Sequence, residues 1–131
     1  MTKLQDNHNR VISSTFHMLE KSIDDMIFIL SNNINECTYE IHRDISESRK
    51  LELLLKLNNL KKYIEDFVID YSLEKEFTVQ SQIFNSKKSF WIMHLEEISS
   101  KTLNKKYGNI EINTKDYDDA LNFLINYIKS I

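Results

Sequence analysis

Four histidines are the side chains of this sequence best suited to acid–base, metal or phosphotransfer chemistry. Two of them, His17 and His94, each precede a glutamate by three residues, Glu20 and Glu97. On a helix, this spacing places an imidazole beside a carboxylate on one face. Two such pairs facing one another could share a zinc ion. Ligand-binding, metal or enzyme-like chemistry around His17 and His94 is therefore one alternative that the sequence leaves open.

The order of residues in these pairs differs from the pattern that helical bundles use for metal centres. Di-iron and di-manganese bundles use Glu-x-x-His, in which the carboxylate comes first. No two histidines of this chain lie four residues apart, and none has a glutamate three residues before it; those positions hold Gln5, Ser14, Tyr39 and Trp91. We therefore predict no catalytic residue, no metal site and no cofactor, and we interpret His17 and His94 as hydrogen-bonded residues at the edge of the core.

The segment from His17 to Lys21 also departs from the histidine phosphotransfer pattern, which carries a lysine–glycine pair after the leucine. Here Glu20 comes first and no glycine follows. The carboxylate of Glu20 would repel an incoming phosphoryl group. Phosphotransfer at His17 thus remains a minor alternative.

The other chemically informative residue types point to structural roles. Cys37 is the single cysteine and has no histidine or basic residue directly beside it, so we predict a buried, unreactive thiol. A single glycine excludes phosphate-binding loops, dinucleotide fingerprints and nucleophile elbows, each of which needs several. Phe77, Phe84 and Trp91 recur every seven residues, the spacing of a helical seam, and are predicted to lie in the core.

The charge balance bears on the class of partner. The formal net charge is -3, and the lysine pairs 61–62, 87–88 and 105–106 are separated by acids, which argues against a nucleic-acid partner. Charged residues interrupt the first 30 positions, so we expect no signal peptide and no membrane span. Together with the lone thiol, this pattern predicts a cytoplasmic protein.

Apolar residues at alternating steps of four and three predict two long helices. The first seam consists of Ile12, Phe16, Leu19, Ile23, Met26 and Leu30. It continues through Ile34, Cys37, Ile41 and Ile45 unless the asparagines between positions 32 and 35 break the helix. Asp44, followed three residues later by Glu47, predicts the start of a second helix. Its seam runs from Leu53 to Tyr71.

Residues 72–85 carry two competing patterns. Phe77, Val79, Ser81 and Ile83 alternate as in a strand, whereas the seven-residue aromatic spacing is typical of a helix. Glu74 and Glu76 would suit a first helical turn, so we predict a third helix from near Ser72 to Lys105–Lys106, with Gly108 in a left-handed cap. Asn113 or Thr114 is predicted to cap a shorter last helix.

These elements predict an all-α fold: one domain over residues 1–131, built as an up-and-down antiparallel bundle of three long helices and a shorter C-terminal helix. We expect a non-catalytic protein-interaction or scaffold module, such as an adaptor-, antitoxin- or immunity-like protein. The first helix carries extra apolar residues, so we also expect a homodimer or another protein partner, and no membrane partner. Those extra residues are Val11, Met18, Ile27, Phe28 and Ile29.

Overall fold

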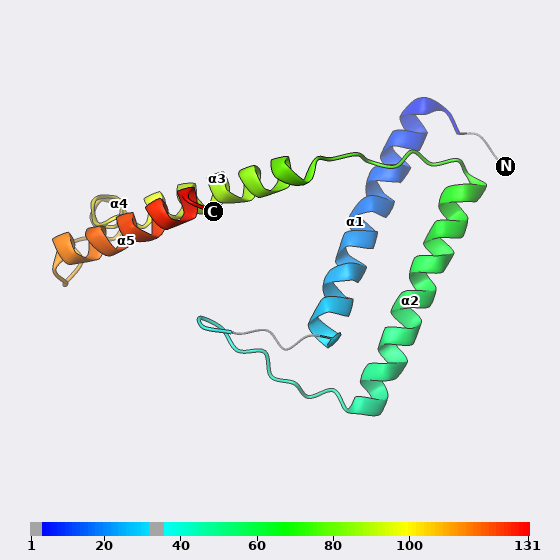
Figure 1. Cartoon of the computed structure of the whole chain (residues 1–131), viewed down its shortest axis with the longest axis horizontal. Coiled ribbons are helices and arrows are strands. Elements are labelled where there is room, and N and C mark those ends of the chain that lie inside the picture. Colours follow the sequence, from blue (N-terminus) through cyan, green and yellow to red (C-terminus); the bar gives the residue numbers. More distant parts are fainter. Residues whose placement is uncertain (1–3, 32–35) are drawn as a thin grey trace. The chain divides into compact units, whose positions relative to one another are not determined.

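The computed structural model describes residues 4–31 and 36–131 (Figure 1). Within these ranges all regular secondary structure is helical, which confirms the predicted all-α class. There are five helices in the described part of the chain: α1 (Asp6–Ser31), α2 (Glu47–Asp70), α3 (Gln80–Glu97), α4 (Ser100–Tyr107) and α5 (Thr114–Lys129). The strand considered for residues 77–83 is not formed.

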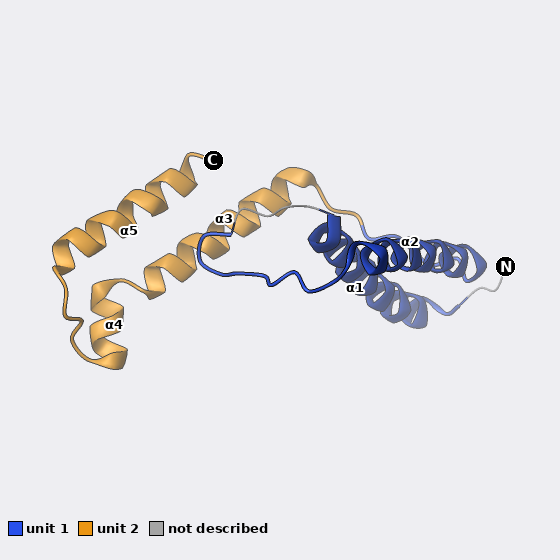
Figure 2. Cartoon of the chain, turned by 90° about the horizontal axis from the view of Figure 1, so that it is seen from below, with its two compact units in different colours: residues 1–76 blue, residues 77–131 orange. Residues whose placement is uncertain are grey.

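The chain divides into two compact units, residues 1–76 and 77–131 (Figure 2). In unit 1, α1 and α2 run in opposite directions and pack against each other (Figure 1). Ile23 and Ile64 are buried, and the rings of Phe16 and Phe67 stack with their centroids 4.6 Å apart. All four residues belong to the two predicted seams, so the sequence pattern located this contact correctly.

The boundary between α1 and α2 differs from the prediction. Cys37, Ile41 and Ile45 lie outside any helix, so the apolar stripe does not continue as helix through them; positions 32–35, including Ile34 and the three asparagines, are outside the described residues. The hydroxyl of Ser46 accepts the Arg49 N–H at 3.2 Å and caps α2, in place of Asp44. The capping residue thus lies two positions later than expected, because the helix begins at Glu47 and the N-cap is the residue directly before it.

The prediction that a third helix starts near Ser72 is wrong, because α2 ends there in a tight cap. Ser72 has a positive φ of 49°. Its N–H binds the Ile69 carbonyl at 3.2 Å, and the Leu73 N–H binds the Val68 carbonyl at 2.9 Å. These bonds form a Schellman motif, in which the residue after the cap is apolar and packs back on the helix. Leu73 is buried, and α3 begins only at Gln80.

Unit 2 contains α3, α4 and α5, so the predicted third helix is divided into two. Ser99 caps α4 by accepting the Thr102 N–H, and both the N–H and the hydroxyl of Ser100 bind the carboxylate of Asp118 on α5. These bonds fix the break between α3 and α4. They also explain why one continuous helix was the wrong prediction, since Asp118 is 18 residues away in sequence from Ser100.

Two predicted helix ends in unit 2 are found. Gly108 follows α4 with φ 89° and ψ 173°, so its φ is positive as expected, but its ψ lies outside the left-handed helical region. Only glycine adopts this combination without strain. Asn113 caps α5 by accepting the Asp116 N–H at 3.2 Å, as predicted.

The predicted aromatic core is not formed. Phe77, Phe84 and Trp91 are 89%, 58% and 45% exposed, and α3 has no buried residue. The contact with α5 uses a different row of α3, in which Ile92 and Leu95 are half-buried, and Leu95 lines one groove with Leu121 and Ile125 of α5. A seven-residue spacing identifies one stripe of a helix, but it does not show whether another element covers that stripe.

Candidate functional site

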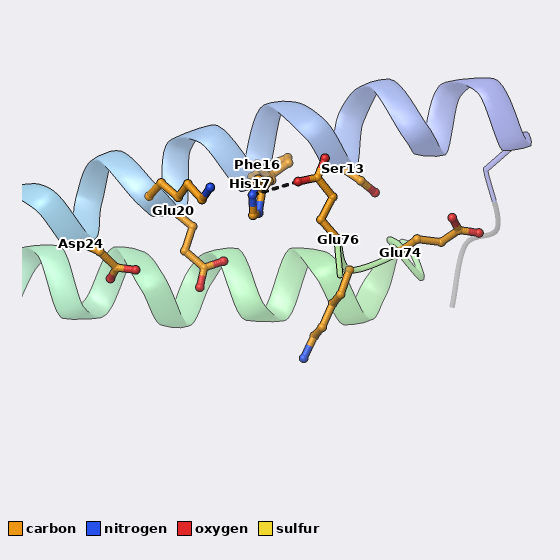
Figure 3. A pocket seen from close by; sticks show the side chains of 9 residues that line it. Ser13, Phe16, His17, Glu20, Asp24, Glu74 and Glu76 are labelled. Atoms are coloured by element: carbon orange, nitrogen blue, oxygen red, sulfur yellow. Dashed lines mark ion pairs between the residues drawn. The ribbon is translucent and has the colours of Figure 1, made fainter. Parts of the chain in front are cut away.

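His17, which the sequence offered only as an alternative centre of chemistry, lies in a groove of unit 1 where residues 74–76 return along α1 (Figure 3). This return is fixed by Asn9, a buried polar side chain on the first turn of α1. Its amide donates to the Ser72 carbonyl at 3.0 Å, and its Oδ1 accepts the Glu74 N–H at 3.1 Å. The hydroxyl of Ser13 donates to the same Oδ1 at 3.1 Å. Asn9 therefore holds the segment that follows α2 against α1.

Directly beyond this clamp, His17 pairs with Glu76. The Nε2 atom of His17 is 2.9 Å from Oε2 of Glu76. Figure 3 shows the glutamate side chain reaching toward the imidazole. The sequence predicted Glu20 as the neighbouring carboxylate; Glu20 also lines the groove, but Glu76, far away in sequence, makes the ion pair. His17 is a half-buried residue at the edge of the helix contact, as predicted.

The groove has a volume of about 390 Å³ and is lined mainly by charged side chains. Its lining residues are Ser13, Phe16, His17, Glu20, Lys21, Asp24, Glu74, Lys75 and Glu76. Asp24 also binds Nζ of Lys61 on α2 at 2.6 Å. This hydrogen bond raises the pKa of Lys61 above its usual range. Three of the lining side chains, His17, Asp24 and Glu76, are thus engaged in holding α1, α2 and the returning segment together.

The pairing of His17 with Glu76 limits the chemistry that this groove could perform. In residues 4–31 and 36–131 no three histidine, cysteine or acidic side chains converge as metal ligands would. The carboxylate of Glu76 lies against Nε2 of His17, a ring nitrogen that phosphotransfer would use. A paired imidazole and carboxylate at the end of this held segment is better suited to keeping two chain segments together than to acting as a catalytic base.

His94, the second histidine of that alternative, lies in unit 2 on α3. Its Nδ1 is 3.6 Å from Oε2 of Glu97, so the pair expected from the sequence is formed. The ring also packs edge-on against Phe90, with centroids 4.2 Å apart. His94 is nevertheless exposed, so its predicted position at the edge of the core is wrong. The reason is again that α5 covers another row of α3.

The prediction of a buried Cys37 is also wrong. Cys37 is exposed and lies between α1 and α2, outside any helix. In the same segment, the carboxylate of Glu36 accepts the Ile41 N–H at 2.9 Å and pairs with Arg43 at 2.8 Å. These local bonds hold the chain in a non-helical conformation, so the stripe that would have buried the thiol is not formed.

Sequence reasoning missed Asn9, the residue that organises the groove. An asparagine on the first turn of a predicted helix is ordinarily a solvent-facing residue, and its partners are 63 and 65 positions away. The only signal was indirect. Ser72 follows the last seam residue of α2, at a position where a helix can end, and a chain reversal there needs a polar partner for its backbone.

None of the described helices is both long and apolar enough to cross a membrane. Comparisons with protein-family models, with curated proteins and with solved structures find no match to this chain.

Proposed function

We propose that this chain is a non-catalytic protein-interaction or scaffold module that presents apolar helix surface to a protein partner. The supporting observation is its accessible surface of 11,020 Å². Two separately folded proteins with the lengths of the two units would together expose roughly 8,700 Å². The excess of about 2,300 Å² is larger than the roughly 800 Å² that one partner buries in an interface of standard size.

Large apolar side chains account for much of this exposed surface. On α3, the exposed residues include Ile83, Phe84, Phe90, Trp91 and Met93. Aromatic residues and methionine are enriched in the cores of protein interfaces, where a few such side chains provide most of the binding energy. Monomeric proteins rarely leave this many of them uncovered on one helix.

Exposed apolar residues on α1 support the same proposal. Val11, Met18 and Ile29 of the predicted wide apolar arc are exposed in unit 1. This proposal includes a homodimer, coiled-coil packing, a cytoplasmic location and an up-and-down arrangement of the long helices. An adaptor, an antitoxin or an immunity protein would each work through such a surface.

Ligand or metal chemistry at the histidines has less support. His17 and His94 each contact one carboxylate, and each contact is explained by packing within its own unit. An interaction module needs no convergent polar site, only surface that is stable when the partner is bound.

Photo-crosslinking in the native cell tests the proposal. A photoreactive phenylalanine analogue at position 84, which is exposed and apolar, should give a discrete covalent adduct with a protein. The same analogue at Asn122, an exposed polar residue of α5, is the matched control and should give little or none. The proposal is contradicted if positions 84 on α3 and 18 on α1 both give no protein adduct.

A further inference from the structure

One surface of unit 2 is specific enough to indicate what covers it. Five exposed apolar side chains lie along the pair of helices α3 and α5, and we call them the hairpin face: Phe84, Trp91, Ile98, Leu124 and Tyr127. Resting on the interaction function proposed above, we propose that the partner of the hairpin face is a second copy of this chain. The two α3–α5 pairs pack face to face about a two-fold axis as four helices.

On α5, the buried residues Leu121 and Ile125 mark the side that packs toward α3. Each helical residue advances about 100° around the axis, so Leu124 lies about 60° to one side of Leu121. Tyr127 lies about 120° from Leu121 in the same direction, and its ring is 6.4 Å from that of Phe123, which lies about 160° from Leu121. Leu124 therefore flanks the packed side of α5, and Tyr127 marks the outer edge of the same apolar surface.

On α3, the half-buried residues Ile92 and Leu95 mark the side that packs toward α5. Trp91 lies about 70° from the middle of this side. Phe84 and the C-cap residue Ile98 lie seven positions before and after Trp91, so the three form one row along the helix.

The rows on α3 and α5 lie on the same side of the helix pair. The two helices run in opposite directions (Figure 2), so equal rotations away from their contact lead to the same side. The hydroxyl of Tyr117, on the Leu124 side of α5, donates to the carbonyl of Ile98. The opposite rotation brings Glu96 together with Asp118 and Asn122 in one groove, at whose base lie Leu95, Leu121 and Ile125. Charged side chains therefore lie on the side of the helix pair opposite the hairpin face.

The charge of the hairpin face favours a second copy over a charged partner. Its five side chains carry no formal charge, and the nearest charged or titratable residues of α3 on this side, Lys87 and His94, lie beyond Trp91 at the rim. A surface without charge meets no repulsion from its own copy, and a two-fold contact covers both surfaces at once. Such a contact also closes the assembly at two chains.

The available area is sufficient for a specific but reversible dimer. The five side chains together expose on the order of 500 Å² in one chain, so two copies would bury about 1,000 Å² from these residues alone. This is near the lower limit for a specific interface. We therefore expect a dimer that dissociates over micromolar concentrations, and not a permanent one.

Sedimentation equilibrium of the full chain tests the assignment with neighbouring residues of one helix. The wild-type protein should pass from a 15.6 kDa monomer to twice that mass as its concentration rises. Leu124→Glu should weaken the dimer at least about tenfold, because it buries an unpaired charge in the contact. Asn126→Glu places the same charge at an exposed position about 140° from Leu121 in the opposite rotation, and it should change the dissociation constant less than about twofold.

A second pair on α3 guards against a variant that simply fails to fold. Trp91→Glu should weaken the dimer and Met93→Glu should not, while far-UV circular dichroism confirms that each variant keeps its helix content. The fluorescence of Trp91, the sole tryptophan, should shift to shorter wavelength as the wild-type dimer forms. All of these results support the proposal.

Three results would overturn it. The first is a wild-type chain that stays monomeric up to roughly 100 µM, well above the expected dissociation range. The second is a dimer that Met18→Glu on α1 weakens and Leu124→Glu does not. The third is a crosslink from position 84 to a different protein only, which would retain the interaction function and remove the second copy as partner. Absence of any adduct would instead contradict the interaction function itself.

Discussion

The two units of this chain hold their helices together by different means. In unit 1, polar contacts are spread along the helix pair: Asn9 binds the Schellman turn, His17 pairs with Glu76, and Asp24 pairs with Lys61. In unit 2, Asp118 binds Ser100 and Tyr117 binds Ile98 near the start of α5, and Nζ of Lys88 on α3 donates to the Ile131 carbonyl just beyond the end of α5. The polar contacts of unit 1 are spread along the helix pair, whereas those of unit 2 lie at the two ends of α5.

The units also differ in which helices contribute buried apolar side chains. In unit 1 both helices do, since Ile23 of α1 and Ile64 of α2 are buried, and Leu73 after α2 is buried as well. Unit 2 buries only Leu121 and Ile125 among its described apolar residues, both from α5. A helix such as α3, which contributes no buried side chain, gains most of its stability from whatever covers it next.

The largest expected effect separates the buried positions of unit 1 from α3. Ile23→Ala should lower the free energy of unfolding by about 3 kcal/mol, because Ile23 is 2% exposed and its removal leaves a cavity. Ile83→Ala on α3, where the side chain is exposed, should cost less than about 1 kcal/mol. Urea unfolding followed by circular dichroism measures both, and equal losses would remove the distinction between the units.

The same experiment tests the predicted single domain. Trp91 reports on unit 2 alone, because it is the sole tryptophan. If the chain unfolds as one domain, Ile23→Ala shifts the tryptophan transition as much as the circular dichroism transition. If the units unfold separately, the tryptophan transition stays in place.

A smaller effect is expected for Asn9, which holds the turn after α2 against α1. Asn9→Ala should destabilise the protein by about 2 kcal/mol, because it leaves the Ser72 carbonyl and the Glu74 N–H without this partner in a partly buried site. The matched control is Asn58→Ala, which removes an exposed hydrogen bond to the Leu54 carbonyl and should cost less than about 0.5 kcal/mol. Thermal unfolding of both variants compares them, and similar midpoints would show that Asn9 holds nothing in place.

The smallest expected effect is on the pH dependence of the contact between Asp118 and Ser100 in unit 2. Hydrogen bonds from the Ser100 hydroxyl and backbone N–H lower the pKa of Asp118. Its contribution is therefore present above the pKa that Asp118 has in the unfolded chain, and it is lost as the pH falls through the lower folded pKa, below about pH 4. Asp118→Asn should reduce this acid-dependent loss of Trp91 signal, whereas Asp119→Asn, one residue on, should leave it unchanged. Identical acid titrations of the two variants would contradict the assignment.

Local patterns predicted the helices more reliably than their ends. The seam residues Phe16, Ile23, Ile64 and Phe67 meet as expected, because four-three spacing puts apolar side chains on one face wherever the helix packs. The Asn113 cap and the positive φ of Gly108 were also predictable, since each depends on the chemistry of one residue. By contrast, Ser72 ends α2 in a conformation usually taken by glycine, and nothing near it in sequence indicated this.

The amino-acid sequence by itself determined the all-α class, the faces of α1 and α2, the Asn113 cap and the positive φ of Gly108, because these depend on residue type and on spacings of a few positions. Only the tertiary structure decided that Glu76 pairs with His17, that Asn9 clamps the turn after α2, and that Phe84 and Trp91 remain exposed. Each of these depends on segments distant in sequence, and a helical stripe contains no information about which partner covers it.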